Sequence, residues 1–212
     1  MLATVPVRVP RAIREQQMLD AAVSVFARSG YVTASMEDVA AQAGITKPMV
    51  YAYLGTKEEL FSACLRREGT RLMEALVEVV RPELAAEQQL WQGLRAFYGF
   101  VAAHRDGWDV LYRQGRALAP FAAQIDGMRA RMVEVVGGML GRAVQARGRV
   151  PDADDVEAMA YAFVGAAESV ADWLIDHQEI AADRAASRMM SAVWLGAESL
   201  LRGEIWRPSG VD

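Results

Sequence analysis

Residues 41–60 read AQAGITKPMVYAYLGTKEEL and contain the clearest local signals in the chain. They predict the end of one short helix, a tight turn, a second short helix and the start of a third. Gly44 supplies the backbone freedom that a sharp turn requires. Pro48 falls in the first turn of the second short helix, where a backbone N–H has no helical partner to lose.

Capping signals mark the helix starts around this stretch. Ser35 followed by Asp38, and Thr56 followed by Glu59, have the spacing of capping boxes, in which the two residues bond reciprocally through side chain and backbone. Thr46 is expected to cap the second short helix. The sequence therefore predicts three separate helix starts within about twenty residues.

The second short helix has an unusual surface. It carries donors, a cation and amphipathic groups but no acid: Thr46, Lys47, Met49, Tyr51 and Tyr53. A solvated helix normally carries Glu or Asp, whereas a surface that approaches phosphates benefits from their absence. Two helices joined by a Gly-containing turn form a helix-turn-helix, whose second helix can enter the DNA major groove. The competing interpretation is a helical hairpin in an unrelated bundle.

Residues 11–60 resemble the DNA-binding domain of the TetR (tetracycline repressor) family of bacterial transcriptional regulators. The matching positions are Ala22, Phe26, 29–31, Thr33, Ser35, 38–40, 43–46, Tyr51 and 56–60. Leu54 and Pro48 depart from the usual residues of the family, and the fold tolerates both changes. The resemblance implies that the DNA-binding residues are Thr33, Ser35, Thr46, Lys47, Met49, Tyr51, Tyr53 and Lys57. Among them, Tyr51, Tyr53 and Lys57 are expected on phosphates, and Thr46, Lys47 and Met49 near base edges.

Charge is unevenly distributed along the 212 residues. The net charge is −4, but residues 1–57 hold six Lys or Arg against four Asp or Glu, and the remainder holds seventeen against twenty-three. A local basic excess suits DNA binding, and an acidic remainder limits non-specific binding elsewhere on the protein. The hydrophobic fraction of 53% is ample for a sizeable core.

The sequence predicts a cytoplasmic protein without a membrane segment. It shows no apolar run of about eighteen residues, and residues 1–10 lack the apolar core of a signal peptide. Cys64, the single cysteine, excludes an internal disulfide and suits a reducing compartment. We interpret it as a small packing residue, with a redox role as the alternative.

Helical periodicity continues almost to the end of the chain, without the alternation typical of strands. We therefore expect an all-α protein of about nine helices. A disordered arm is predicted at residues 1–10, a three-helix DNA-binding domain at residues 11–57, and a helical effector-binding and dimerisation domain at residues 58–205. Apart from the two short helices, the expected helices are residues 11–29, 57–80, 83–104, 107–118, 121–147, 152–177 and 183–202.

The last two predicted helices are rich in Gly and Ala, at residues 161–167 and 191–197. Their apolar character extends around more of the helix than one core-facing stripe needs. Either they are central in the monomer or they pair with a copy of themselves. The TetR resemblance implies a homodimer interface there, with Val164, Ala167, Val193 and Ala197 as the expected contributors.

Nothing catalytic assembles in the sequence. His104 and His177, the two histidines, have no metal-ligand spacing to Cys, Asp or Glu. There is no G-x-S-x-G motif and no Gly-rich phosphate loop. We expect no enzymatic activity, no metal and no cofactor.

The middle of the chain is supplied with aromatic residues and methionine. The first interpretation is that these side chains simply pack in the hydrophobic core. The functional one, implied by the resemblance, is a mostly apolar effector cavity with a few polar groups. The candidate lining residues are Trp91, Phe97, Phe100, His104, Trp108, Tyr112, Phe121 and Met128.

These features together predict a dimeric, ligand-responsive transcriptional regulator and favour a repressor over an activator. It would bind palindromic double-stranded operator DNA and be released by a small apolar or aromatic effector. Arg113 and Arg116 could hold one carboxylate of such a molecule. The alternative is a helical ligand-binding or scaffold protein of the same fold that does not bind DNA.

Overall fold

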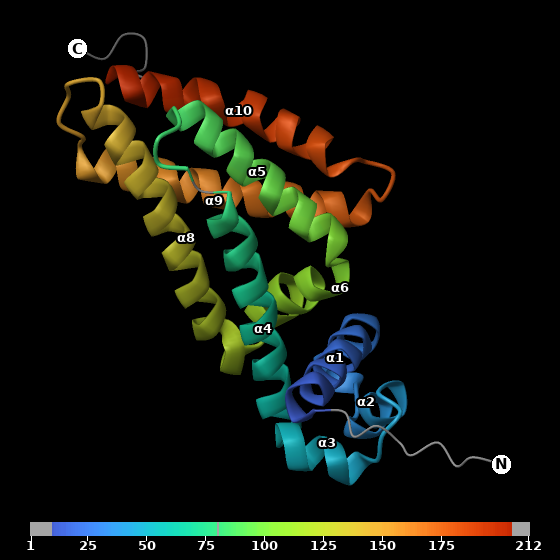
Figure 1. The fold of residues 1–212 in the computed structure, drawn as a ribbon. Helices are drawn as coiled ribbons and strands as arrows, with labels where there is room; N and C mark the ends of the chain where they lie inside the picture. Colours follow the sequence, from blue (N-terminus) through green and yellow to red (C-terminus); the bar gives the residue numbers. More distant parts are fainter. Residues whose placement is uncertain (1–9, 80, 205–212) are drawn as a thin grey trace. The chain divides into compact units, whose positions relative to one another are not determined.

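The computed structural model describes residues 10–79 and 81–204, so the arm expected at residues 1–10 falls outside the described residues but for Pro10. The regular elements in these two ranges are all helical (Figure 1), which confirms the predicted class. The chain divides into two compact units. The first comprises the described residues of Met1–Thr70 together with Asp106–Ile125, and the second those of Arg71–Arg105 together with Asp126–Asp212.

The helices follow the predicted order, with ends that differ by a few residues. Three short elements, α6, η1 and α7, follow one another without a break, and counting them as one irregular helix gives the predicted nine for the described part of the chain. The elements are α1 (Arg11–Thr33), α2 (Met36–Gln42), α3 (Lys47–Leu54), α4 (Lys57–Glu78), α5 (Ala86–Ala103), α6 (Arg105–Trp108), η1 (Asp109–Gln114), α7 (Gly115–Ala117), α8 (Ala119–Gln145), α9 (Ala153–Asp176) and α10 (Ala182–Arg202).

Two helices differ from the sequence-based prediction in form. Gly30 was expected to end the first helix, and it breaks α1 with φ 74° and ψ 156°, but one further turn follows it. Residues 107–118 were expected as one short α-helix, and their centre, Asp109–Gln114, is instead a π-helix. A π-helical segment inserts an extra residue into a helix, and such segments often lie at functional sites.

The first unit is held together by aromatic rings. Phe26 of α1 meets Phe61 of α4 edge to face, with ring centroids 4.9 Å apart. Phe121 of α8 lies 4.7 Å from Phe61 and 5.3 Å from Tyr31, again between centroids. Such pairs contribute about 0.5–1.5 kcal/mol each beyond their buried area. They join the helix-turn-helix segment to residues 106–125.

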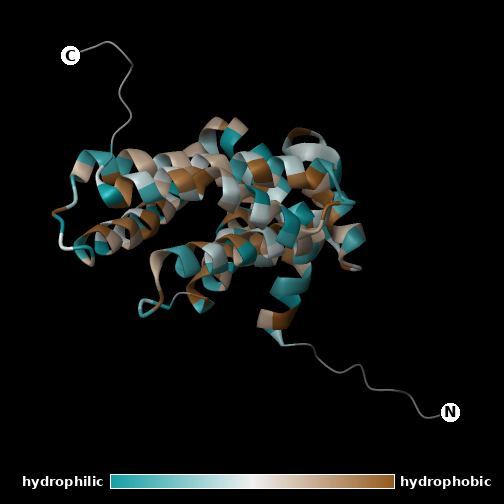
Figure 2. Cartoon of the chain, turned by 90° about the horizontal axis from the view of Figure 1, so that it is seen from above, coloured by the Kyte–Doolittle hydropathy of each residue, from teal (hydrophilic) through white to brown (hydrophobic). Residues whose placement is uncertain are grey.

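In the second unit, α5, α9 and α10 lie side by side (Figure 1). Tyr98 of α5 donates a hydrogen bond to the carbonyl oxygen of Ala167 at 3.3 Å. Arg129 of α8 and the buried Glu168 of α9 form an ion pair at 3.1 Å. Figure 2 shows hydrophobic and hydrophilic residues interspersed along the helices, as expected for helices with one buried face.

The compact units do not coincide with the domains predicted from the sequence. The predicted boundary lies at residue 57, whereas the first unit runs on through α4 to Thr70 and includes Asp106–Ile125. The physical reason is that Phe61 and Phe121 complete the aromatic core beneath Tyr31. The functional division at residue 57 remains a prediction.

One helix in the described part of the chain, α9, is long and apolar enough to cross a membrane by length and composition alone. We had expected no such apolar segment from the sequence. In the structure Phe163, Val164 and Leu174 are buried among the helices of the second unit. Buried residues make up 33% of the apolar stretch of α9.

Candidate nucleic-acid interface and ligand cavity

The turn between α2 and α3 is built around Gly44. Its φ of 65° lies in the left-handed region, which only Gly adopts without strain. The N–H of Gly44 donates to the carbonyl oxygen of Ala41 at 3.2 Å, and that of Ile45 to Ala40 at 3.0 Å. This pair of bonds is a Schellman motif, which satisfies the last carbonyls of α2. The predicted helix-turn-helix is therefore present, with a defined turn geometry.

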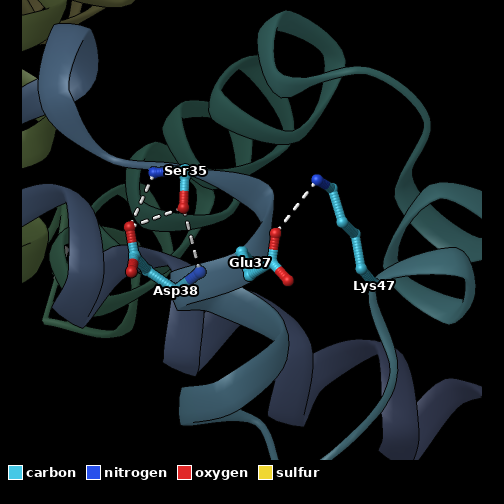
Figure 3. Close-up of polar contacts among 4 residues, drawn as sticks. All are labelled: Ser35, Glu37, Asp38 and Lys47. Atoms are coloured by element: carbon cyan, nitrogen blue, oxygen red, sulfur yellow. Dashed lines mark hydrogen bonds and ion pairs between the residues drawn. The ribbon is translucent and has the colours of Figure 1, made fainter.

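The predicted capping box at the start of α2 is confirmed (Figure 3). The N–H of Asp38 donates to Ser35 Oγ at 3.1 Å, and the N–H of Ser35 donates to the Asp38 carboxylate at 3.0 Å. The Ser35 hydroxyl also donates to that carboxylate at 2.6 Å. These hydrogen bonds, the side-chain one first, lower the pKa of Asp38 below its ordinary value. Asp38 is thus held as a carboxylate at the positive end of the helix.

The start of α3 is less tightly fixed than predicted. Thr46 stands at the N-cap position with an extended backbone, but its side chain makes no capping hydrogen bond. Thr46 is exposed. Pro48 lies in the first turn, as expected. A free hydroxyl at this place suits a contact to a molecule outside the chain.

Lys47 forms an ion pair across the turn. Its Nζ lies 3.1 Å from a carboxylate oxygen of Glu37 on α2 (Figure 3), and both side chains are exposed. An exposed pair of this kind is worth about 0–1 kcal/mol, so Lys47 can leave Glu37 for a stronger anion. The sequence of the second short helix gave no sign of this pair, because Glu37 lies on the neighbouring helix α2.

The outer face of α3 carries the predicted side chains together. Tyr51 is 46% exposed, and Met49 is half-buried. Val50 and Leu54, on the opposite face, are buried. The inner face therefore anchors α3 in the first unit and leaves the predicted recognition residues outside.

Arg11 at the start of α1 adds a cation to this surface. Its guanidinium lies over the ring of Tyr53, 5.1 Å from the ring centroid. Sequence spacing could not show this contact, because the two residues are 42 positions apart. The signal in the sequence was that Arg8, Arg11 and Arg14 lie close together before and at the start of the first helix.

The beginning of α4 contributes Lys57. The predicted capping box is present, with the N–H of Thr56 donating to the Glu59 carboxylate at 2.7 Å and the N–H of Glu59 to Thr56 Oγ1 at 3.2 Å. Lys57 Nζ donates to the carbonyl oxygen of Val32 at 3.0 Å and lies 4.8 Å from the Tyr31 ring centroid. Lys57 thus also ties α4 to the last turn of α1, which the sequence did not indicate.

A cavity of about 160 Å³ lies within the second unit, among the C-terminal part of α4 and helices α5, α8 and α9. Its polar lining residues are Gln89 and Arg142. The remaining lining is apolar: Met73, Leu76, Val77, Val79, Leu90, Gly93, Leu94, Phe97, Met132, Val135, Val136, Met139, Phe163, Val164 and Ala167. Such a lining favours an apolar ligand.

Only Phe97 of the eight predicted effector residues lines this cavity. Trp108 and Tyr112 are buried in the first unit and stack on each other with ring centroids 3.9 Å apart. Phe121 lies in the aromatic core of the same unit. The other predicted residues, Trp91, Phe100, His104 and Met128, belong to the second unit without lining the cavity, and Phe100 and His104 stack at 4.4 Å.

The residues predicted for the dimer interface differ in exposure. Val164 and Ala197 are buried within the single chain, at 5% and 0% exposure, and Ala167 and Val193 are half-buried. The exposed small residues lie on other faces of the same helices: Ala158 and Ala162 of α9, and Ser191, Ala192 and Gly196 of α10. Cys64 is buried, and burial raises the pKa of its thiol to about 12, which fits a packing residue.

The comparisons with known proteins agree with this architecture. A family model described as bacterial regulatory proteins, tetR family, matches residues 18–64, and one described as tetracyclin repressor-like, C-terminal domain, matches residues 86–196. A crystal structure of a TetR-like transcriptional regulator from Rhodococcus sp. RHA1 is 43% identical, over 90% of this chain and 99% of that one, with a TM-score of 0.79.

Two further relatives are more distant. The HTH-type transcriptional activator FasR of Mycolicibacterium smegmatis is 29% identical over 136 residues, which are 64% of this chain and only 62% of that protein. A crystal structure of FadR from Bacillus subtilis in complex with stearoyl-CoA is 19% identical over 90% of this chain and 99% of that one, with a TM-score of 0.71, and shows a shared fold. With both family models and the Rhodococcus structure in agreement, this chain belongs to the TetR family of bacterial transcriptional regulators.

Proposed function

We propose that this regulator binds operator DNA as a homodimer through α3, and that a ligand in the second unit controls the binding. The observation that carries the DNA-binding part is the outer face of α3. It presents Lys47 and Tyr51 without an acid on the helix itself, and Arg11 stands over Tyr53 beside it. Such a surface matches the phosphate backbone in charge and in hydrogen-bond donors.

Contacts to phosphate and to bases are expected from different parts of this surface. Tyr51, Tyr53 and Lys57 would hold phosphates. Lys57 also stands at the start of α4, where backbone N–H groups favour an anion. Thr46, Lys47 and Met49 lie at the N-terminal end of α3, the end that reads base edges in helix-turn-helix proteins. Thr33 and Ser35 are exposed at the neighbouring helix ends.

A second copy of the chain would cover the outer faces of α9 and α10. These faces carry small residues together with Leu195, which is 69% exposed, and Tyr161, which is 44% exposed. Small residues let helices approach closely, and large exposed apolar side chains favour burial against a partner. A two-fold dimer presents two α3 helices to half-sites of a palindrome, one helical turn or a multiple apart.

The ligand would act by preferring one state of the dimer. A difference in affinity of about 1–3 kcal/mol between DNA-competent and DNA-incompetent states is sufficient. The relatives described above include the activator FasR and a FadR in complex with stearoyl-CoA. We propose repression, relieved by a largely apolar ligand, and a cytoplasmic location in contact with the chromosome.

The alternative is a helical ligand-binding or scaffold protein that keeps the fold without binding DNA. Fluorescence anisotropy with fragments of the source genome, at several salt concentrations, separates the two. The proposal predicts binding whose logarithmic affinity falls linearly with the logarithm of the salt concentration. If the protein bound no DNA fragment even at low salt, the alternative of a protein that does not bind DNA would be favoured.

A further inference from the structure

Arg142 lies at the rim of the apolar cavity. It lines the cavity, its side chain is exposed, and it has no hydrogen-bond or ion-pair partner among residues 10–79 and 81–204. Guanidinium groups bind carboxylates through paired, charge-assisted hydrogen bonds. The rim therefore holds one free site for an anionic group.

The cavity wall leads directly to this guanidinium. Val135, Met139 and Arg142 follow one another at i, i+4 and i+7 along α8, so they share one face of the helix. Val135 on this face and Val77 on α4 are 52% and 62% exposed, although both line the cavity. The two valines mark its open side, beside the charged rim.

We propose that this cavity takes a small amphiphilic monoanion, with a compact apolar body inside and a carboxylate on Arg142. The inference deepens the ligand-binding role proposed above and rests on that role only for its effect on DNA. Among the residues that the structure describes, no acid lines the cavity, so a cationic ligand finds no counter-charge from them. Gln89 is uncharged, and one N–H of its amide already donates to the carbonyl oxygen of Leu84 at 2.7 Å, so Arg142 is the charged group that can anchor a carboxylate.

The size of the cavity limits the apolar body. An apolar protein cavity of about 150 Å³ admits a molecule the size of benzene, and this one measures about 160 Å³. A body of roughly six to eight carbons therefore fills the enclosed part. Longer chains would extend past Val77 and Val135 into solvent and gain little more.

A larger side chain in place of Gly93 would fill the cavity. This glycine lies on α5 and lines the cavity, and a Cβ added there meets nothing within 4 Å. Gly99 lies on the same helix, also with open space at its Cβ, but does not line the cavity. Gly93→Leu is therefore the test variant, and Gly99→Leu is its matched control.

Arg142→Gln tests the charged group. Arg131→Gln is its control, since Arg131 is exposed on α8 and does not line the cavity.

The test is isothermal titration of the full-length protein with hexanoate, octanoate, decanoate and the uncharged analogue 1-octanol. We expect affinity to rise about fourfold per methylene up to about eight carbons and then to level off. Gly93→Leu should abolish octanoate binding, while Gly99→Leu retains it. Arg142→Gln should weaken octanoate at least tenfold, with 1-octanol unchanged and Arg131→Gln without effect.

Circular dichroism establishes that each variant is folded, and Ala167→Leu, which fills the same cavity, replaces Gly93→Leu if that variant does not fold. The proposal is overturned if octanoate does not bind, if binding survives both cavity-filling variants, or if Arg142→Gln binds octanoate as the parent does. Operator titration is scored separately. If octanoate binds but does not change the affinity for DNA, the regulatory role is refuted and the ligand site stands. If the parent protein binds no DNA at all, only the proposed function is refuted.

Discussion

The side chain of Gln114 bridges the break in α1 by accepting a hydrogen bond from the backbone N–H of Tyr31 at 3.0 Å. Its amide nitrogen donates to the carbonyl oxygen of Phe26 at 2.8 Å and to the Asp109 carboxylate at 2.8 Å. The non-helical backbone of Gly30 interrupts the helical bonding of this turn, so Gln114 satisfies groups on both sides of the break. The π-helix η1 thereby supports the helix-turn-helix.

Gln114→Ala should lower the free energy of unfolding by about 1–3 kcal/mol, because it leaves a partly buried donor and acceptor of α1 without partners. The measurement is urea denaturation followed by circular dichroism. Gln145→Ala, at an exposed position near the end of α8, is the control and should change stability by less than about 0.5 kcal/mol. Equal urea midpoints for the two variants would show that the bridge contributes nothing.

Gly30→Ala should destabilise the protein by about 1–3 kcal/mol. A Cβ at this position meets no atom within 4 Å, so the cost comes only from placing a side chain at φ 74° and ψ 156°. Gly127→Ala is the control, since this glycine is helical and also has open space around it. That change should stabilise by about 0.5–1 kcal/mol. Thermal melts that moved in the same direction would contradict this account of the break.

Asp38→Asn should destabilise the protein near neutral pH and matter less in acid. Its hydrogen bonds with Ser35 hold the pKa of Asp38 below 3.8 in the folded state, so the charged form stabilises the fold above the ordinary carboxyl pKa. That contribution is lost as the pH falls through the lowered pKa. Denaturation of parent and variant across pH 7 to 2.5 measures the difference. A difference that grew as the pH fell would reverse the predicted sign.

Leu195→Glu should yield monomers and weaken operator binding, because a charge on an exposed apolar position of α10 opposes burial against a second copy. Light scattering measures the mass at micromolar concentration. Val150→Glu places the same charge at a position that is 92% exposed and outside the helices, and this variant should remain a dimer. A monomeric parent protein would contradict the proposed assembly.

Lys57→Ala should weaken binding to all DNA sequences alike and lower the salt slope by about one, as expected for the loss of one phosphate contact. Anisotropy titrations at two or more salt concentrations measure both quantities. Because Lys57 also bonds Val32 in the free protein, a thermal melt of the variant is the necessary control. An unchanged slope in a folded variant would remove Lys57 from the interface.

Local signals in the sequence predicted the helix-turn-helix well. Ser35 with Asp38 and Thr56 with Glu59 form their capping boxes, and Gly44 makes the turn, because each of these features depends on residues within a few positions. Thr46 was expected to cap α3 and does not. Capping also depends on the side-chain rotamer, which residue type alone does not determine.

Features that join distant residues could not be predicted in the same way. Gln114 reaches Tyr31 across 83 positions, and no periodicity in the sequence indicates a π-helix. The aromatic residues proposed for the effector site were divided between two units, because core aromatics and cavity aromatics have the same helical spacing. The cavity is lined mainly by Met, Val and Leu, and Arg142 at its rim was not singled out by any motif.

Selection of bound DNA from a random-sequence library, followed by sequencing, shows whether two α3 helices read one operator. We predict an enriched inverted repeat whose half-site centres lie about 10 base pairs apart, or a multiple of this spacing. Lys47→Ala should change the preferred base at one position of each half-site, by roughly 1–3 kcal/mol. A library with no enrichment, or a single half-site bound by one protomer, would contradict the claim that two α3 helices read the operator.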